Sequence, residues 1–228
     1  MRKLDLSNVT AVCIDGRPLT QEKRLRYSQI IKYMRSTVNF AEIKLLMLDD
    51  PEVDGTSYVK VNQIDSLEEY SQFCLTELSD HIDTDFCMIF QDDGFIVNPE
   101  LWRPVFLSYD YIGAPWPPVQ PWPEPDRYDR RVGNGGFSIR SKRLLEATKN
   151  FEASDNEDII IVSAKRDELD SQGFTFAPVE IAMDFSIETQ FLQEQAMSKC
   201  FGFHGKYRVE EALRIISKKS EIFSTSLV

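Results

Sequence analysis

The stretch Phe86-Cys87-Met88-Ile89-Phe90-Gln91-Asp92-Asp93-Gly94-Phe95 runs from an apolar segment into two adjacent carboxylates and a glycine. Residues 86–90 have the composition of a buried strand, and Gly94 lets the chain turn sharply after it. In an open α/β sheet, ligands bind at the carboxyl ends of the strands. Hard divalent cations such as Mg²⁺ and Mn²⁺ take carboxylate and phosphate oxygens as ligands. The stretch therefore predicts either a metal site at a sheet edge or a plain turn after a strand.

The chain before this stretch alternates between strand and helix patterns. Strand patterns cover residues 9–14, 43–48 and 58–61, and helix patterns cover residues 19–35 and 66–81. Ser66 and Glu69 have the spacing of a capping box at the start of the second helix. Such alternation predicts an α/β fold with a central mixed, mostly parallel sheet covered by helices.

The chain after this stretch is less regular. Residues 109–113 could form a strand, and residues 114–125 hold six prolines and two tryptophans. Proline at that density excludes a helix or a central strand, so we expect an ordered surface loop. Helix patterns follow at residues 141–149, 155–169 and 209–220, and residues 221–228 are expected to form a loose tail.

Composition limits the class of protein. The chain has 228 residues with 37 acidic and 26 basic side chains, a net charge of −11, which makes nucleic acid an improbable partner. It has no apolar run of the roughly 20 residues that would span a bilayer, and its first residues lack the apolar core of a signal peptide. Four widely spaced cysteines without a CxxC pair indicate reduced core thiols, so we expect a cytoplasmic protein without a transmembrane segment.

Three further motifs could carry chemistry. Gly133-Asn134-Gly135-Gly136 either allows a ligand to approach the backbone closely or forms a hairpin turn. Asn156-Glu157-Asp158 opens an apolar helix. In one interpretation Asn156 caps the helix and the two acids interact favourably with its positive end. In the other, a carboxylate held at the helix start is a general base. His204, between glycines in a Phe-Gly-Phe-His-Gly segment, is a candidate ligand, whereas His81 has a surface context.

These motifs, in this order, resemble the pattern of GT-A glycosyltransferases: a DxD motif, a glycine loop, an xED motif and a C-terminal histidine. More specifically, the chain resembles the DUF5672 family of small GT-A-like proteins. Similar domains occur in enzymes that build surface glycans of bacteria and large algal viruses. The blocks that carry the resemblance lie within residues 85–206 and read Gln-Asp-Asp-Gly-Phe at 91–95, Tyr-Asp-Tyr-Ile-Gly-Ala-Pro-Trp at 109–116, Val-Gly-Asn-Gly-Gly-Phe-Ser at 132–138, Asn-Glu-Asp at 156–158 and Phe-Gly-Phe-His-Gly at 201–205.

The resemblance implies a metal site. Asp93 would bind the metal directly and His204 would complete its shell. Asp92 would touch the donor ribose or a metal-bound water. Gln91, also placed on the donor side, is a departure, because this neutral amide stands where the DxD motif begins with an acid. The implied cofactor is Mn²⁺ or Mg²⁺, held with one carboxylate fewer than the motif provides.

The resemblance also implies an acceptor side. Gly135 and Gly136 would line it, and Asp158 would be the general base of an inverting transfer. Glu157 would act on acceptor hydroxyls or on the helix end. Adjacent residues at a helix start point roughly 100° apart, so only one of the two acids can face the sugar.

Four further residues are candidates for contacts with the nucleotide or with a sugar. Asp15 and Arg17 follow the first strand, where GT-A enzymes hold the nucleotide base and ribose. Trp116 and Trp122, on the proline-rich loop, could stack on sugar faces or simply pack the loop.

The resemblance thus implies one GT-A domain over residues 1–228, with nucleotide-sugar binding in about residues 1–95 and acceptor binding and catalysis in about residues 96–220. Its implied activity is an inverting, metal-dependent transfer of a hexosyl or deoxyhexosyl group from a nucleotide-diphosphate donor, UDP first, to a glycan hydroxyl. Two alternatives stay open. One is a nucleotidyltransferase that makes sugar nucleotides, and the other is a carbohydrate-binding module with a degenerate site.

Overall fold

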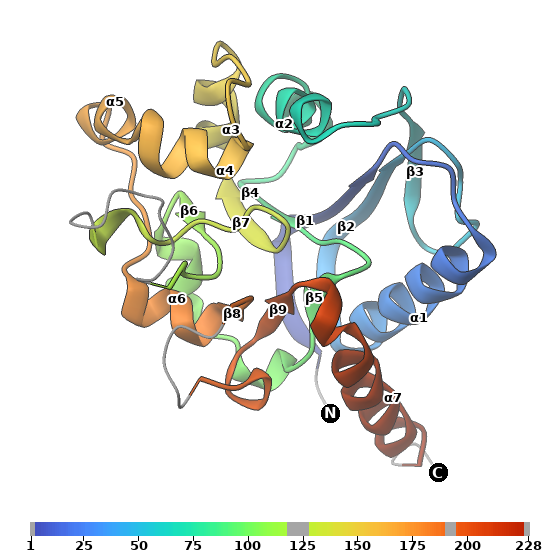
Figure 1. Cartoon of the computed structure of the whole chain (residues 1–228). Coiled ribbons are helices and arrows are strands. Elements are labelled where there is room, and N and C mark those ends of the chain that lie inside the picture. The colour runs from blue at the N-terminus through green and yellow to red at the C-terminus, as the bar shows by residue number, and fades with distance from the viewer. Residues whose placement is uncertain (1–2, 118–127, 190–194, 226–228) are drawn as a thin grey trace.

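The computed structural model describes residues 3–117, 128–189 and 195–225. Its centre is a six-stranded sheet with helices on both faces (Figure 1). Strands β3, β2, β1 and β4 run parallel to one another. At one edge β7 pairs antiparallel with β4, and β6 pairs antiparallel with β7. The predicted mixed, mostly parallel α/β sheet is therefore confirmed. The strands are β1 Leu4–Asp15, β2 Val38–Met47, β3 Ser57–Lys60, β4 Phe86–Ile89, β6 Tyr111–Ile112 and β7 Ser138–Ser141.

The apolar run in β1 supplies both faces of the sheet. Side chains alternate along a strand, so Ala11 and Cys13 join one hydrophobic cluster while Val12 and Ile14 join another. The first cluster packs under α1 Gln21–Thr37 and α7 Val209–Thr225, and the second under α2 Leu67–Thr76. A parallel strand that is buried on both faces must be apolar almost throughout, which explains why it has no polar alternation.

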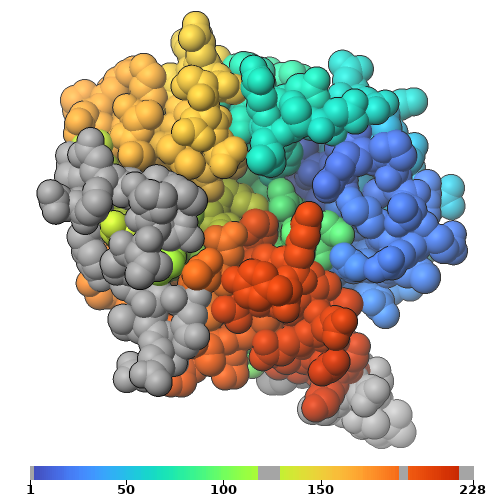
Figure 2. All heavy atoms as spheres, in the orientation of Figure 1, coloured from blue at the N-terminus to red at the C-terminus, as the bar shows by residue number. Residues whose placement is uncertain are grey.

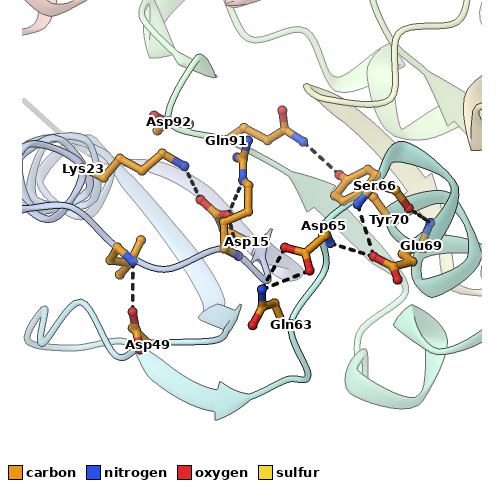
Figure 3. Close-up of polar contacts among 12 residues, drawn as sticks. Asp15, Lys23, Asp49, Gln63, Asp65, Ser66, Glu69, Tyr70, Gln91 and Asp92 are labelled. Atoms are coloured by element: carbon orange, nitrogen blue, oxygen red, sulfur yellow. Dashed lines mark hydrogen bonds and ion pairs between the residues drawn. The ribbon is translucent and has the colours of Figure 1, made fainter.

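The capping box is confirmed at the start of α2. The Ser66 hydroxyl accepts the backbone N–H of Glu69, and the Glu69 carboxylate accepts the backbone N–H of Ser66 (Figure 3). The helix ends at Thr76, earlier than predicted, and a 3₁₀ turn, Leu78–His81, follows. Helix α7 ends later than predicted, at Thr225. The other helices are α3 Lys142–Thr148 and α6 Val179–Phe185, with 3₁₀ turns at Pro99–Leu101, Pro104–Ser108, Tyr128–Arg130, Met197–Lys199 and Lys206–Arg208.

The helix predicted over residues 155–169 is broken into three pieces. These are α4 Glu157–Ile159, a π-helical segment Ile160–Ala164 and α5 Arg166–Ser171. The Lys165 N–H bonds to the carbonyl of Ile160, five residues back. The Asn156 side chain makes no capping bond, so the predicted cap is wrong. Single π turns inside helices occur often at functional sites.

A second, three-stranded sheet lies beside the first and was not predicted. It comprises β5 Gly94–Ile96, β9 Gly202–His204 and β8 Ser186–Ile187, in the order β5-β9-β8. Phe95 and Phe203 meet edge to face, with ring centroids 4.8 Å apart. Phe137 and Phe185 stack at 5.1 Å in the same hydrophobic cluster. The aromatic packing holds strands that are too short to persist alone.

The proline-rich loop begins inside the protein rather than on its surface. Trp116 is 5% exposed and belongs to a third hydrophobic cluster, around α3, α4 and the π-helical segment. The carbonyl of Pro117 accepts a bond of 3.0 Å from the buried guanidinium of Arg131. The remainder of the predicted loop, residues 118–125 with Trp122, lies outside the described residues.

All four cysteines, Cys13, Cys74, Cys87 and Cys200, are buried and unpaired, in agreement with the predicted core thiols. Burial raises the pKa of each thiol. Across the described segments, no helix has both the length and the apolar character needed to cross a membrane.

We predict that Ser66→Ala lowers the free energy of unfolding by about 1 kcal/mol, because it removes a helix cap that also orders Glu69. Urea denaturation measures the change. Ser154→Ala is the matched control, since Ser154 is exposed outside any helix and should have little effect. An equal change in both variants would contradict a capping role.

Candidate active site

The two carboxylates at the end of β4 lie in a tight turn. The backbones of Gln91 and Gly94 exchange two hydrogen bonds, of 2.7 Å and 3.2 Å. Asp92 and Asp93 are therefore the two central residues of a hairpin that leads into β5. The plain turn that the sequence allowed is present, and its geometry aims two acids at the edge of the parallel sheet.

Pairing of β5 with β9 brings His204 to this turn. Gly94 lies opposite His204, and the Gly205 N–H donates to the Asp93 carbonyl at 2.7 Å. Asp93 Oδ1 lies 3.7 Å from His204 Nε2. On the other side of the ring, Nδ1 lies 3.1 Å from Glu188 Oε1. Burial would lower the pKa of His204, but the Glu188 hydrogen bond and the charge of Asp93 outweigh it and raise the pKa.

The Asp93 and His204 pair fits part of a cation site. Among the described residues, no group of three or more histidine, cysteine or acidic side chains surrounds a common point. Two protein ligands suffice where phosphate oxygens of a substrate supply the others. A carboxylate on the far nitrogen, as Glu188 provides, is the usual partner of a metal-binding histidine. The donor set therefore fits Mn²⁺ or Mg²⁺ in the presence of a phosphate ligand.

Gln91 is held beside this pair. Its Oε1 lies 3.2 Å from His204 Nε2. Its Nε2 donates to the Tyr70 hydroxyl at 2.9 Å (Figure 3). The amide that replaces the first acid of the DxD pattern thus has two definite partners, one of them the candidate ligand. Gln91 therefore lies next to His204 without adding negative charge to the candidate metal site.

The glycine loop brings the backbone close to functional side chains. A Cβ on Gly136 would lie 2.2 Å from His204 Nε2, and one on Gly135 would lie 1.9 Å from Glu157 Oε1. In this loop it is Asn134, and not one of the glycines, that adopts the left-handed backbone conformation, with a φ of 57°. Glycine is therefore required at these two positions, because a Cβ there would clash with the side chains of Glu157 and His204.

The two acids of the Asn-Glu-Asp motif have different environments. Glu157 is 5% exposed, and its Oε1 accepts a bond of 2.8 Å from Arg140, which is fully buried in β7. The Glu157 N–H donates to the Ser71 hydroxyl of α2 at 3.1 Å. Glu157 thereby serves as an anchor between three elements, and its charge is paired.

Asp158 faces the cavity. Its two oxygens accept the backbone N–H groups of Gly135 at 2.9 Å and Ile159 at 2.8 Å. Burial and the neighbouring charge of Glu157 raise the pKa of Asp158 to about 7, although the Gly135 bond and Arg140 act in the opposite direction. A carboxyl group with such a pKa can exchange a proton near neutral pH.

The cavity has a volume of about 410 Å³ and brings several of these residues together. Figure 2 shows a hollow between the α2 region and the segment that follows residue 200. Of its described lining residues none is lysine or arginine, whereas three are acidic. The lining residues are Leu67, Gln91, Trp116, Asn134, Gly135, Gly136, Asn156, Glu157, Asp158, Ile159, Glu188, Thr189, His204 and Tyr207.

Asp15 lies at the end of β1 within a charged cluster. Its carboxylate accepts bonds from Arg17 at 2.9 Å and from the Tyr27 hydroxyl at 3.0 Å. It also accepts a bond of 2.6 Å from Lys23 (Figure 3). Burial would raise the pKa of Asp15, but the bonds from Arg17 and Lys23 outweigh it and lower the pKa. Asp15 and Arg17 therefore bind each other in this structure, and the guanidinium remains the more exposed partner.

Asp92 also has a basic partner, since Arg26 of α1 donates to its carboxylate at 3.0 Å. Asp92 and Asp93 thus turn to different neighbours, one toward α1 and the other toward His204. Trp116 lines the cavity but presents little surface.

Sequence reasoning missed Arg140, Glu188, Arg26 and Tyr70. Arg140 is an isolated basic residue in a Ser-Ile-Arg-Ser strand, which was the one available signal, because an arginine inside a buried strand needs a partner. Glu188 becomes recognisable only when β8 pairs with β9 beside His204.

The raised pKa of Asp158 predicts a pH dependence of stability. The folded protein holds this proton more tightly than the unfolded chain, whose Asp pKa is near 3.8. The resulting stabilisation is complete below about pH 4 and is lost as the pH rises through about 7. The free energy of unfolding of the wild type should therefore fall, relative to Asp158→Asn, between about pH 4 and pH 8. Urea denaturation across this range measures the difference, and a constant difference would contradict the raised pKa.

Comparisons with known proteins bear on the family and the fold of the chain. A family model described as "Protein of unknown function (DUF5672)" matches residues 55–204, more than half of the chain. No curated protein matches. A glycosyltransferase involved in glycosylation of the major capsid of PBCV-1 superposes with a TM-score of 0.50 at 11% identity, over 91% of this chain and 98% of that one.

Two other solved structures are less similar. An active-site mutant of LgtC gives a TM-score of 0.48 at 9% identity, over 92% of this chain and 95% of that one. The mannosyltransferase PcManGT from Pyrobaculum calidifontis, in complex with GDP-Man and Mn²⁺, gives 0.42 at 14% identity, over 76% and 55%. The fold is GT-A, as the sequence pattern predicted. The chain belongs to the DUF5672 family.

Proposed function

We propose that the protein is an inverting glycosyltransferase that moves a hexosyl or deoxyhexosyl group from a nucleoside-diphosphate sugar, UDP first, to a glycan hydroxyl. One observation carries the proposal: Asp93 and His204 meet at the edge of the parallel sheet, and His204 shares a cavity with Asp158. Four buried, unpaired thiols support a reducing, cytoplasmic location.

The charge of the cavity supports a cation-dependent reaction. A nucleoside diphosphate gains negative charge as it leaves, and the described lining supplies acids but no lysine or arginine to offset it. Asp93 and His204 would hold Mn²⁺ or Mg²⁺, which when bound neutralises a diphosphate. Glu188 would keep the His204 ring oriented, with Nε2 toward the ligand.

Asp158 is the proposed base. One of its oxygens would accept the proton of the acceptor hydroxyl while that oxygen bonds to C1 of the donor sugar. The bond between C1 and the diphosphate breaks, and its electron pair leaves with the diphosphate. Attack from the opposite face inverts C1 in a single step, without a covalent intermediate. Glu157, paired with Arg140, would keep the base at the floor of the cavity.

The charged cluster at the end of β1 is the proposed nucleotide side. Arg17 has an exposed side chain, and Asp15 fixes its guanidinium at 2.9 Å. Lys23 and Arg26 lie on the same helix and pair with Asp15 and Asp92. These residues would bind the base and ribose of the donor. Gly135, Gly136 and Trp116, which line the cavity, would belong to the acceptor side.

A second candidate is a carbohydrate-binding protein without catalysis. The neutral Gln91 and the small number of metal-binding side chains among the described residues favour it. Hydrolysis of nucleotide sugars in the presence of Mn²⁺ separates the two candidates, because a binding protein leaves the donors intact. A screen of nucleotide sugars by thermal shift, with and without Mn²⁺, would first identify the donor.

We predict that Asp93→Asn abolishes the dependence of UDP binding on Mn²⁺. The variant loses the one carboxylate in the proposed pair, so its affinity for UDP with Mn²⁺ should fall at least about tenfold. Isothermal titration with UDP, with and without Mn²⁺, measures the effect. Asp83→Asn, an exposed acid away from the cavity, is the control. Equal affinities in wild type and Asp93→Asn would refute the cation assignment.

We predict that Asp158→Asn lowers transfer by about 10²–10⁴-fold, the usual effect of removing a positioned general base. Donor binding should persist, and the melting temperature at about pH 4, where the folded-state proton on Asp158 still stabilises the wild type fully, should match the wild type. Initial rates with the donor found in the screen measure the loss. Asp155→Asn, an exposed acid three residues earlier, should retain transfer. Wild-type rates in Asp158→Asn would leave the base unassigned.

A further inference from the structure

The side-chain amide of Gln91 lies against the nitrogen of His204 that the proposed cation would use. Gln91 Oε1 is 3.2 Å from His204 Nε2, and Asp93 Oδ1 is 3.7 Å from the same nitrogen. Two oxygen atoms from the turn after β4 thus lie near one nitrogen of β9. Amide oxygens bind hard divalent cations, as carboxylate oxygens do. The amide is therefore a candidate ligand in addition to Asp93 and His204.

The spacing of these atoms suits an octahedral cation. In octahedral coordination with bonds of about 2.1 Å, neighbouring ligand atoms lie about 3.0 Å apart. The separation of 3.2 Å between Gln91 Oε1 and His204 Nε2 is close to this value. Asp93 Oδ1, at 3.7 Å, would reach it through a small rotation of the carboxylate. Both oxygens can therefore be neighbours of the nitrogen in one coordination shell, and phosphate and water oxygens can complete it.

Tyr70 holds the oxygen end of the amide toward the imidazole. The Tyr70 hydroxyl, on α2, accepts the side-chain N–H of Gln91 at 2.9 Å (Figure 3). The backbone of Gln91 is fixed as well, by its two hydrogen bonds with Gly94. A ligand that is held at its backbone and at the far end of its side chain loses little conformational entropy when a cation binds.

The three candidate ligands carry little negative charge. Asp93 contributes one carboxylate, an amide is neutral, and an imidazole that binds a metal is neutral because the metal takes the place of a proton. Two neighbouring acids have other partners, since Asp92 is paired with Arg26 and Glu188 contacts Nδ1 of the imidazole. A divalent cation on these ligands keeps part of its charge for the diphosphate of a nucleotide, whereas a second carboxylate would offset more of it.

We propose that Gln91 supplies the third protein ligand of the cation, and that its neutral amide makes cation binding depend on the diphosphate of the nucleotide. Tyr70 is then a positioning residue, because it acts by holding the amide oxygen toward the site. This inference rests on the function proposed above. It adds a ligand to that site and a reason why nucleotide and cation would bind together.

Binding of Mn²⁺ alone tests the ligand without catalysis. Electron paramagnetic resonance of free Mn²⁺ gives the affinity of each variant at one fixed pH. Gln91→Leu, which keeps much of the size and loses the oxygen, should weaken Mn²⁺ binding at least about tenfold. Gln91→Glu, which adds a carboxylate, should strengthen it. Gln172→Leu, an exposed glutamine outside the cavity, is the matched control. Unchanged or tighter binding in Gln91→Leu would overturn the ligand.

The dependence on diphosphate is measured by isothermal titration with UDP, with and without saturating Mn²⁺. Mn²⁺ should raise the affinity of the wild type for UDP at least about fivefold, the lower end of usual couplings between two sites. In Gln91→Glu the gain from Mn²⁺ should be smaller, because the added carboxylate offsets charge that the diphosphate would otherwise offset. A gain as large as in the wild type would overturn the role of the neutral amide.

Tyr70→Phe tests the positioning role. It should weaken Mn²⁺ binding about tenfold, the lower end for loss of a group that orients a ligand. In a protein that also carries Gln91→Glu, the same change should have little effect, because the two oxygens of a carboxylate are equivalent and need no hydroxyl to select between them. An equal loss in both backgrounds would show that Tyr70 acts only on the packing of α2, and would overturn its positioning role.

The outcomes separate this ligand from the proposed reaction. If Asp93→Asn abolishes the Mn²⁺ dependence of UDP binding while Gln91→Leu leaves it unchanged, the ligand assignment fails and the proposed function stands. If Mn²⁺ binds through Gln91 but no nucleotide sugar is hydrolysed or transferred, the proposed reaction fails and the ligand assignment stands. A wild type that binds no Mn²⁺, alone or with UDP, would overturn the cation site and this ligand together.

Discussion

The site depends on one pairing, the antiparallel register that sets Gly94 opposite His204. A Cβ at residue 94 would lie 2.7 Å from the His204 ring, so glycine there is a requirement of the contact. This register joins the end of the parallel sheet to a segment more than a hundred residues later. It places the imidazole beside Asp93, and the Gly205 N–H fixes the backbone of the turn. Loss of the register would separate the two residues even if every helix remained folded.

The second constraint is the buried ion pair between Arg140 and Glu157. A buried charge that loses its partner costs several kcal/mol, so the pair holds β7 and the start of α4 in one arrangement. Gly135 sits against the same carboxylate, and Ser71 binds the same residue from α2. The base candidate Asp158 takes its position from this anchor. Its pKa is raised first by burial and then by the negative charge of Glu157 beside it.

The sequence was informative where local chemistry decides structure. Apolar runs identified β1, β2 and β4, and the Ser66 and Glu69 spacing identified the start of α2. The short strands β8 and β9 have no such signature, since they form only through partners distant in sequence. The π turn after Ile159 depends on packing, which a helical pattern does not contain. The nearness of Asp93 and His204 was expected from a family pattern alone, because no spacing rule connects them.

The burial of every thiol has a practical side. Cys13 lies in a central strand and Cys200 in the segment just before β9, and both are buried away from a reagent in water. A maleimide dye should therefore leave the native chain unlabelled. One cysteine introduced on α2 and another on α7, which cover opposite faces of the central sheet, would accept fluorophores with no need to remove the native four. The distance between two faces of the molecule could then be followed by energy transfer while nucleotide sugars are added.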